Sequence, residues 1–177
     1  MTKDSSLERD YKTQVNEAAG KNSNRVFSNS SLEHAYFLTQ KLIHNANHEI
    51  KIITRKFDAR FYQDLLPDFK SFLEKDKKNK LAIGIMEGDN NMLLKDLKSQ
   101  FDNQVEIYFF SKAQSQALIN KDKDVYINYF VNDTNGFRYE YEDEKIDDGV
   151  VSAFANFNDE KSARVLRDFF DKLTSVA

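Results

Sequence analysis

The chain has no cysteine and no tryptophan among its 177 residues, one proline and five glycines. Without cysteine there are no disulfides, thiolate zinc sites, iron–sulfur clusters or cysteine nucleophiles. No apolar run approaches the roughly 20 residues of a membrane-spanning helix. The polar start, residues 1–20, lacks the apolar segment of a signal peptide. We therefore expect a cytoplasmic protein that does not enter a membrane.

An excess of charge of one sign is also missing, because 26 Lys and Arg face 29 Asp and Glu, for a net charge of -3. This near-balance argues against a generally basic nucleic-acid binder and leaves room only for a local basic pocket. A hydrophobic share of 40%, with 15 Phe and 8 Tyr, is enough to bury a core. We expect a flexible polar tail over residues 1–25, with a short helix over residues 7–19 of thin apolar face as the alternative, and a single α/β domain over residues 26–177.

Hydrophobic periodicity predicts alternating helices and strands after this tail. Apolar residues three and four apart predict a helix that begins at a Ser30 or Ser31 cap and ends near Asn45. Pro67 lies inside a second helical pattern, so that helix is either kinked there or begins just before it. Asn158 is the expected cap of the last helix. The remaining patterns predict helices over residues 61–74, 92–101 and 113–119, and strands over residues 49–54, 81–86, 105–110, 125–133, 137–142 and 150–157.

This order predicts an α/β fold, a mixed β-sheet sandwiched by helices. Asn135-Gly136 between two alternating segments is a strong hairpin signal, because both residue types accept positive φ. In such sheets, ligands bind beyond the carboxyl ends of the parallel strands. Three loops take that position, over residues 55–58, 87–90 and 111–112.

The first of these loops carries the best anion-binding candidates. Arg55, Lys56 and Arg60 supply guanidinium and ammonium donors that complement phosphate, although solvated loop charges are the ordinary alternative. The usual catalytic motifs are absent: there is no Walker loop, no nucleophile elbow and no dinucleotide fingerprint. We expect no cofactor.

Histidine offers little metal chemistry in this sequence. His44 and His48 are four residues apart, but the helix ends between them and no third ligand is indicated nearby. His34 is expected to be a packing residue. We therefore expect no metal site.

Carboxylates concentrate in one short stretch, which is the most lopsided charge feature of the chain. Six acids lie between positions 140 and 148, next to two aromatic residues that can anchor an interface. The partner-binding candidates are Tyr139, Glu140, Tyr141, Glu142, Asp143 and Glu144. The alternatives are a divalent-ion site or a charged hairpin edge that blocks strand-to-strand aggregation.

The order of elements and two short motifs give the chain a resemblance to one half of the phospholipase D superfamily. The motif strand of that family reads His-x-Lys-x-x-x-x-Asp, and a Gly-Ser-x-Asn-like strand and a packing helix follow. Here Tyr126 stands at the histidine, Asn128 at the lysine, and Asp133 matches the aspartate. Residues 153–156 keep only the asparagine, Asn156. The resemblance covers roughly residues 27–174.

What the resemblance implies is an inactive phospholipase D-like domain. The family's chemistry uses an imidazole that attacks phosphorus and a lysine that stabilises the phosphoryl charge. No histidine occurs after position 48 to replace the imidazole. Members with a single half pair as homodimers, so the resemblance implies a homodimer here. The ligand-binding candidates, for a phosphate-bearing ligand or nucleic acid, are Arg55, Lys56, Tyr126, Asn128, Asp133 and Asn156.

Two other functions compete with this interpretation. One is a small interaction protein of the bacterial immunity or antitoxin type, which would use its acidic hairpin to bind a basic partner protein. The other is an active nuclease or hydrolase that holds Mg²⁺ with Asp58, Glu87 and Asp89.

Overall fold

The computed structural model describes residues 3–29, 31–57, 59–88, 92–120, 125–142 and 152–175. The helices are α1 (Lys3–Gly20), α2 (Leu32–Asn45), α3 (Ala59–Lys75), α4 (Met92–Gln100), α5 (Lys112–Gln116) and α6 (Glu160–Thr174). The strands are β1 (Phe27–Asn29), β2 (Glu49–Thr54), β3 (Lys80–Ile85), β4 (Val105–Phe109), β5 (Ile119–Asn120), β6 (Val125–Asn132), β7 (Phe137–Glu142) and β8 (Ser152–Asn156).

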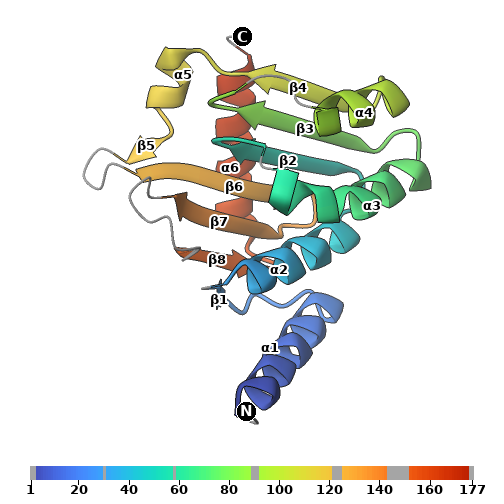
Figure 1. The fold of residues 1–177 in the computed structure, drawn as a ribbon, viewed down its shortest axis with the longest axis vertical. Coiled ribbons are helices and arrows are strands. Elements are labelled where there is room, and N and C mark those ends of the chain that lie inside the picture. Colours follow the sequence, from blue (N-terminus) through green and yellow to red (C-terminus); the bar gives the residue numbers. More distant parts are fainter. Residues whose placement is uncertain are drawn as a thin grey trace.

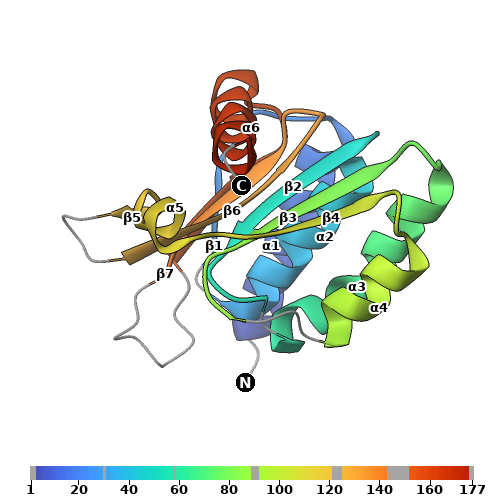
Figure 2. The same ribbon diagram turned by 90° about the horizontal axis from the view of Figure 1, so that it is seen from above.

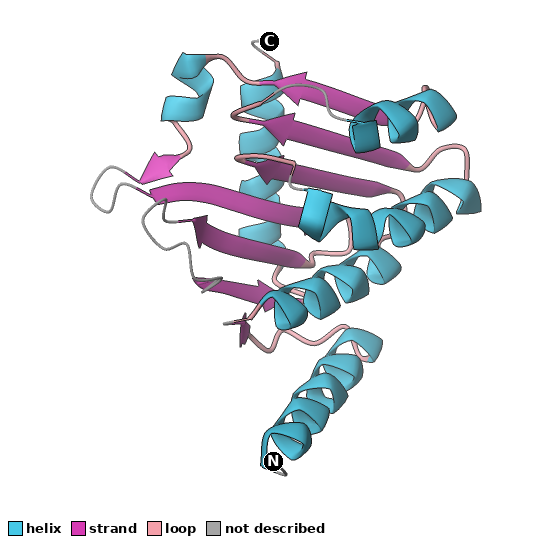
Figure 3. Cartoon of the chain, viewed as in Figure 1, coloured by secondary structure: helices cyan, strands magenta, loops and turns pink. Residues whose placement is uncertain are grey.

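The strands form one mixed sheet in the order β1-β8-β7-β6-β2-β3-β4, and β5 pairs with β6 beside this path (Figure 1; Figure 3). The strands β2, β3 and β4 are parallel, whereas all other neighbours are antiparallel. Helices α1 to α4 lie on one side of the sheet and α6 lies on the other (Figure 2). The predicted α/β fold with a mixed sheet between helices is therefore confirmed.

The central strand β2 has the composition of a strand buried on both faces. Its sequence Glu-Ile-Lys-Ile-Ile-Thr is rich in β-branched residues, and every position after Glu49 is buried. Ile50 and Ile52 belong to the core below α1 to α4, and Ile53 belongs to the core below α6. The edge strand β4 is partly open to solvent, since Phe109 is 44% exposed.

The hairpin between β6 and β7 forms at the predicted position. Asn135 adopts φ 68, a conformation that asparagine accepts more readily than most residues. Gly136 is required for a different reason: a Cβ atom there would lie 2.8 Å from Cδ2 of Leu42. Asn132 closes the turn, because its Oδ1 accepts hydrogen bonds from the backbone N–H groups of Thr134 and Gly136.

The expected polar tail is wrong for residues 3–20, which form α1 and pack on α2. Val15 is fully buried, and Ala18 and Ala19 are nearly so. The Tyr11 ring stacks on His34 at 3.9 Å, and His34 Nε2 lies 2.7 Å from Glu8 Oε2. The apolar stripe of this helix is thin, and polar and aromatic contacts provide most of its attachment to α2. Hydrophobic periodicity is therefore a weak signal for it.

Two helix boundaries also differ from the prediction. The last helix is capped by Asp159 rather than Asn158, and Asp159 accepts from the backbone N–H of Ser162 at 3.1 Å. Hydrogen bonds from the hydroxyl and backbone of Ser162 lower the pKa of the Asp159 carboxyl. Helix α3 runs through Pro67 from a start eight residues earlier. Its fully buried Leu65 and Phe69 bracket the proline, so tertiary packing outweighs the lost hydrogen bond.

Candidate functional site

Four of the predicted ligand residues meet where β2 and β3 end and β6 begins. Arg55 directly follows β2, and its Nε lies 3.0 Å from Oε2 of Glu87 in the loop after β3. The Arg55 backbone N–H donates to Oδ1 of Asn128 at 2.7 Å. The Arg55 guanidinium lies 4.3 Å from the centre of the Tyr126 ring. Lys56 Nζ lies 3.8 Å from the same Glu87 oxygen. The sequence did not identify Glu87 as part of this group.

Arg55 and Lys56 against Glu87 leave this cluster with a net charge of +1. Burial raises the pKa of Glu87, but the hydrogen bond from Tyr126 and the charges of Arg55 and Lys56 lower it by more. The pKa of this carboxyl is therefore below its usual value of 4.5. Glu87 is therefore ionised at neutral pH. The Arg55 side chain is 13% exposed, whereas that of Lys56 is 60% exposed. The cluster thus presents one accessible cation, Lys56, at its surface.

Asp133 and Asn156 do not belong to this cluster, which corrects the sequence-based site. Asp133 lies five residues beyond Asn128, about 17 Å along an extended strand at about 3.3 Å per residue. Its carboxylate accepts from the backbone N–H groups of Asn47 at 2.9 Å and His48 at 2.8 Å.

Asn156 also lies at the far end of the sheet, since it pairs with Phe137 at the start of β7. Its Nδ2 donates to the Asn24 carbonyl at 2.6 Å, and its Oδ1 accepts from the Asn158 backbone at 2.7 Å. Asp133 and Asn156 thus fix loops rather than line a ligand site.

A buried polar row that the sequence did not indicate crosses the sheet on the side of α1 to α4. Asn128 of β6 pairs with Glu140 of β7, which pairs with Ala153 of β8, which pairs with Asn29 of β1. Directly paired residues point to the same face of a sheet, so their side chains lie in one line. The strict alternation along β6 and β7 is the sequence signal that would have revealed this row.

Arg138 holds this row together. Its Nη1 lies 2.6 Å from Glu140 Oε2, and its Nε donates to Asn29 Oδ1 at 3.3 Å. The Arg138 side chain is 7% exposed and the Glu140 side chain 20%. Nδ2 of Asn29 is buried without a hydrogen-bond partner among the described residues. This row thus contains a mostly buried ion pair between Arg138 and Glu140. Among the described residues, Nδ2 of Asn29 is its donor without a hydrogen-bond partner.

The described partner-binding candidates, Tyr139, Glu140 and Tyr141, do not share one face of the sheet. Strand alternation places Tyr139 and Tyr141 toward α6, where Tyr139 packs on Phe154 with ring centres 5.5 Å apart. Glu140 points to the opposite face and is neutralised by Arg138. Glu142 is the last residue of β7, and Asp143 and Glu144 lie outside the described residues. Among the described candidates, the two tyrosines and Glu140 therefore lie on opposite faces of the sheet.

The three histidines each have a side-chain partner of their own. Their rings contact Glu8 (His34, 2.7 Å), Asp68 (His44, 2.6 Å) and Asn79 (His48, 3.2 Å). Within the described ranges, no group of three or more potential ligands gathers closely enough to hold a metal ion. Of the Mg²⁺ candidates, Glu87 pairs with Arg55, and Asp58 and Asp89 lie outside the described residues.

The third predicted ligand loop serves α5 instead. Ser111 caps this short helix and shares a capping box with Gln114, so its hydroxyl is occupied.

Comparison with solved structures finds the same fold in a DNA-binding protein. The chain is similar to TrmBL2, an archaeal chromatin protein whose structure shows a novel mode of DNA binding, with a TM-score of 0.59 and 13% sequence identity. The match covers 95% of this chain and 60% of the TrmBL2 chain, so this chain spans less than two thirds of TrmBL2. No family model and no curated protein sequence matches the chain. At this identity the likeness shows the fold alone.

No helix in the described part of the chain is long and apolar enough to span a membrane.

Proposed function

We propose that the chain is a non-catalytic, phospholipase D-like module that binds a phosphate-bearing ligand, with nucleic acid as the ligand class. The observation that carries this proposal is what the side chains at the two motif positions, Tyr126 and Asn128, contact. Asn128 accepts a hydrogen bond from the Arg55 backbone, and the Tyr126 ring lies against the Arg55 guanidinium. Both side chains are used to support the loop after β2, where the family's chemistry needs a nucleophile and a cation.

Tyr126 is not arranged to replace the missing imidazole. Its hydroxyl donates to Glu87, which is the position a general base would take. The pKa of Glu87 is lowered below 4.5, however, and a phenol has a pKa near about 10. Proton transfer from Tyr126 to Glu87 is therefore unfavourable. The pair is suited to holding Arg55 in place.

Two observations support nucleic acid as the ligand. The fold is shared with TrmBL2, a chromatin protein that binds DNA. In addition, Lys56 is an exposed cation at the carboxyl ends of the parallel strands, where α/β sheets bind ligands. A single exposed lysine is suited to one phosphate contact and not to a tight small-molecule site.

The proposal is tested by measuring binding and hydrolysis on the same protein. Fluorescence anisotropy with a labelled DNA duplex measures affinity, and bis(p-nitrophenyl) phosphate with and without Mg²⁺ reports phosphodiester hydrolysis. We expect DNA binding without hydrolysis above the buffer rate. Hydrolysis by the wild type that is lost in Tyr126→Phe would overturn the non-catalytic assignment, and the absence of DNA binding would overturn the ligand class.

The interaction-protein alternative is favoured by a different surface from the one expected. A groove of about 380 Å³ runs between the aromatic side of β7 and β8 and helix α6, with Tyr139, Phe154 and Val165 in its lining. Val165 is 59% exposed. If the chain binds a protein here, Val165→Asp abolishes capture of that partner from the native host and Glu140→Gln does not. Equal loss with both variants would contradict this surface.

The homodimer implied by the resemblance stays a proposal. Sedimentation equilibrium gives the mass in solution directly, and a monomer at all concentrations would refute the dimer.

A further inference from the structure

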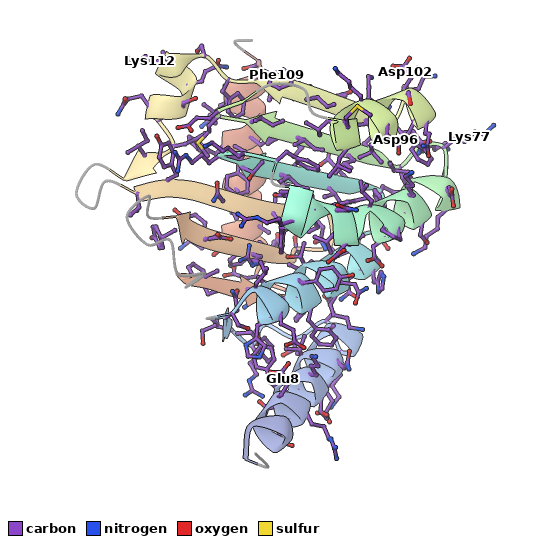
Figure 4. The ribbon with its side chains drawn as sticks, in the orientation of Figure 1. Glu8, Lys77, Asp96, Asp102, Phe109 and Lys112 are labelled. Carbon is purple, nitrogen blue, oxygen red and sulfur yellow. The ribbon has the colours of Figure 1, made fainter. Side chains whose placement is uncertain are left out.

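A lysine-rich loop lies at the end of the sheet opposite the Arg55 cluster. It joins α3 to β3, and its exposed lysines, here called the lysine edge, are Lys75, Lys77 and Lys78. Lys77 extends outward at this end of the molecule, far from Lys112 (Figure 4). Four lysines against Glu74 and Asp76 give residues 74–80 a net charge of +2 in a chain whose overall charge is negative.

Two side-chain amides, those of Asn79 and Gln104, hold this loop in place. Asn79 is 1% exposed and its Nδ2 donates to the Phe72 carbonyl at 2.7 Å. Nε2 of Gln104, from the chain just before β4, lies within 3.1 Å of three carbonyl oxygens, those of Leu73, Asp76 and Asn79. A charged run in a chain segment without such contacts is ordinarily solvated surface. Here the backbone that carries the lysines is fixed, so less conformational entropy is lost when a ligand binds.

The acids near the loop are largely occupied, whereas the lysine edge is not. Asp96 pairs with Lys70 at 3.0 Å and Asp102 pairs with Lys98 at 2.9 Å. Asp76 Oδ1 accepts from the Lys78 backbone N–H at 2.9 Å. In the described part of the chain, Lys75, Lys77 and Lys78 form no ion pair, so their charge is available to a ligand. The Arg55 cluster, by contrast, offers only Lys56.

We propose that the phosphate backbone of duplex nucleic acid docks on the lysine edge. This inference rests on the proposed nucleic-acid function and names the surface that carries it. Duplex DNA carries one negative charge per about 1.7 Å of axis, so closely spaced lysines reach several phosphates at once. Phosphate contacts of this kind position a protein on DNA without reading its sequence.

The composition of this surface argues against the other polyanionic partners. Reversible membrane attachment requires an apolar or lipid anchor in addition to basic residues. Protein interfaces place aromatic or aliphatic anchors at their centre. The exposed large hydrophobic residues of the described chain are Val26, Leu32, Met92, Phe109 and Val165, and none of them is in the loop.

A lysine near the carboxyl end of a helix also stabilises that helix by interacting with its dipole. The test has to separate this stabilising role from ligand binding. Lys75 is in the last turn of α3, so it is left unchanged. Lys77→Glu combined with Lys78→Glu alters only residues beyond the helix. Lys21→Glu combined with Lys95→Glu is the matched control, because it makes the same change in net charge at exposed positions elsewhere in the chain.

The experiment is a salt titration of the affinity for a labelled duplex of about 20 base pairs, measured by anisotropy. Three phosphate contacts predict a slope of about -2.7 in log K against log salt, or about a 40-fold loss between about 50 and 200 mM. One remaining contact predicts a slope of about -0.9 and about a 3.5-fold loss. We expect the loop variant to approach the second behaviour and the control variant to keep the first.

Each outcome separates this inference from the proposed function. If the wild type binds the duplex and the loop and control variants have equal slopes of log K against log salt, the proposal for the lysine edge is wrong. The proposed nucleic-acid binding would then still hold. No wild-type binding at any salt concentration would overturn both. Binding to vesicles of phosphatidylcholine and phosphatidylserine, without binding to the duplex, would identify a membrane surface instead. Urea unfolding of both variants confirms that each is folded.

Discussion

Replacing Glu140 by alanine tests whether this residue is an internal ion-pair partner or a free interface residue. Glu140 lies 2.6 Å from Arg138, whose side chain is only 7% exposed. Removing the carboxylate leaves the Arg138 guanidinium buried, with Asn29 Oδ1 as its remaining hydrogen-bond acceptor. A buried charge that loses its partner has a large desolvation cost that nothing offsets. The variant should therefore be markedly less stable than the wild type.

The size of the effect follows from the burial of the two side chains. Loss of one partner of a fully buried pair typically costs about 3–5 kcal/mol. Glu140 is 20% exposed, so water already screens part of this interaction, and we expect about 3 kcal/mol, the lower end of that range. Replacing both charges by apolar residues, Arg138→Met with Glu140→Leu, should recover most of the loss, because no unpaired charge remains.

The assay is urea unfolding followed by circular dichroism, with Asp102→Ala as the control. Asp102 forms an ion pair of similar length, 2.9 Å, with Lys98, but its side chain is 75% exposed. Its loss should lower the free energy of unfolding by at most about 0.5 kcal/mol. If Glu140→Ala costs no more than Asp102→Ala, the buried row does not hold this part of the sheet, and Glu140 becomes available to a partner.

Three further variants test other parts of the structure. Gly84→Ala should lower the free energy of unfolding by about 1–3 kcal/mol, because the new Cβ would clash with the Phe110 ring, 2.7 Å from its Cε2. Adding Phe110→Leu should relieve the clash, and an unchanged urea midpoint would contradict the packing. The pKa of Glu87 is lowered, so its stabilisation is present above pH 4.5 and is lost as pH falls through the lower folded value. Glu87→Gln should reduce the dependence of the free energy of unfolding on pH in that acidic range. Parallel curves for the variant and the wild type would refute the contribution of the Glu87 carboxylate. Val15→Asp places a charge at a fully buried position and should detach α1. Trypsin then cleaves after Arg9 or Lys12 faster than in the exposed control Asn16→Asp, and equal rates would argue against α1 docking.

Local patterns were sufficient to predict most of the fold. The β-branched run of β2, the Ser31 cap of α2 and the Asn135-Gly136 turn each depend on residues close in sequence, and all three are in place. Among the described side chains of α1, the buried ones are Val15, Ala18 and Ala19, and this thin apolar face favoured a tail over a helix. The contacts that attach α1, such as Tyr11 with His34, join residues 23 positions apart and leave no periodic signal.

The candidate site was harder to predict, because its geometry depends on the register of the strands. The sequence-based site combined Asn128 with Asp133 and Asn156. Asp133, however, lies five residues along the extended chain from Asn128, and Asn156 lies at that same far end of the sheet. Alternation along β7 likewise assigns Tyr139 and Glu140 to opposite faces. The two loops that carry Arg55 and Glu87 were expected at the same edge of the sheet, but their ion pair was not predicted, because it depends on the side-chain positions that the parallel pairing of β2 and β3 sets.

The central claim is that this chain binds nucleic acid without cutting it, and one sample tests both parts. A doubly labelled DNA duplex is incubated with excess protein and Mg²⁺ at low salt, anisotropy is followed over time, and the DNA is then resolved on a denaturing gel. We predict a stable rise in anisotropy and full-length DNA at the end. Shortened products that disappear with Tyr126→Phe, or an anisotropy that never rises, would contradict the account.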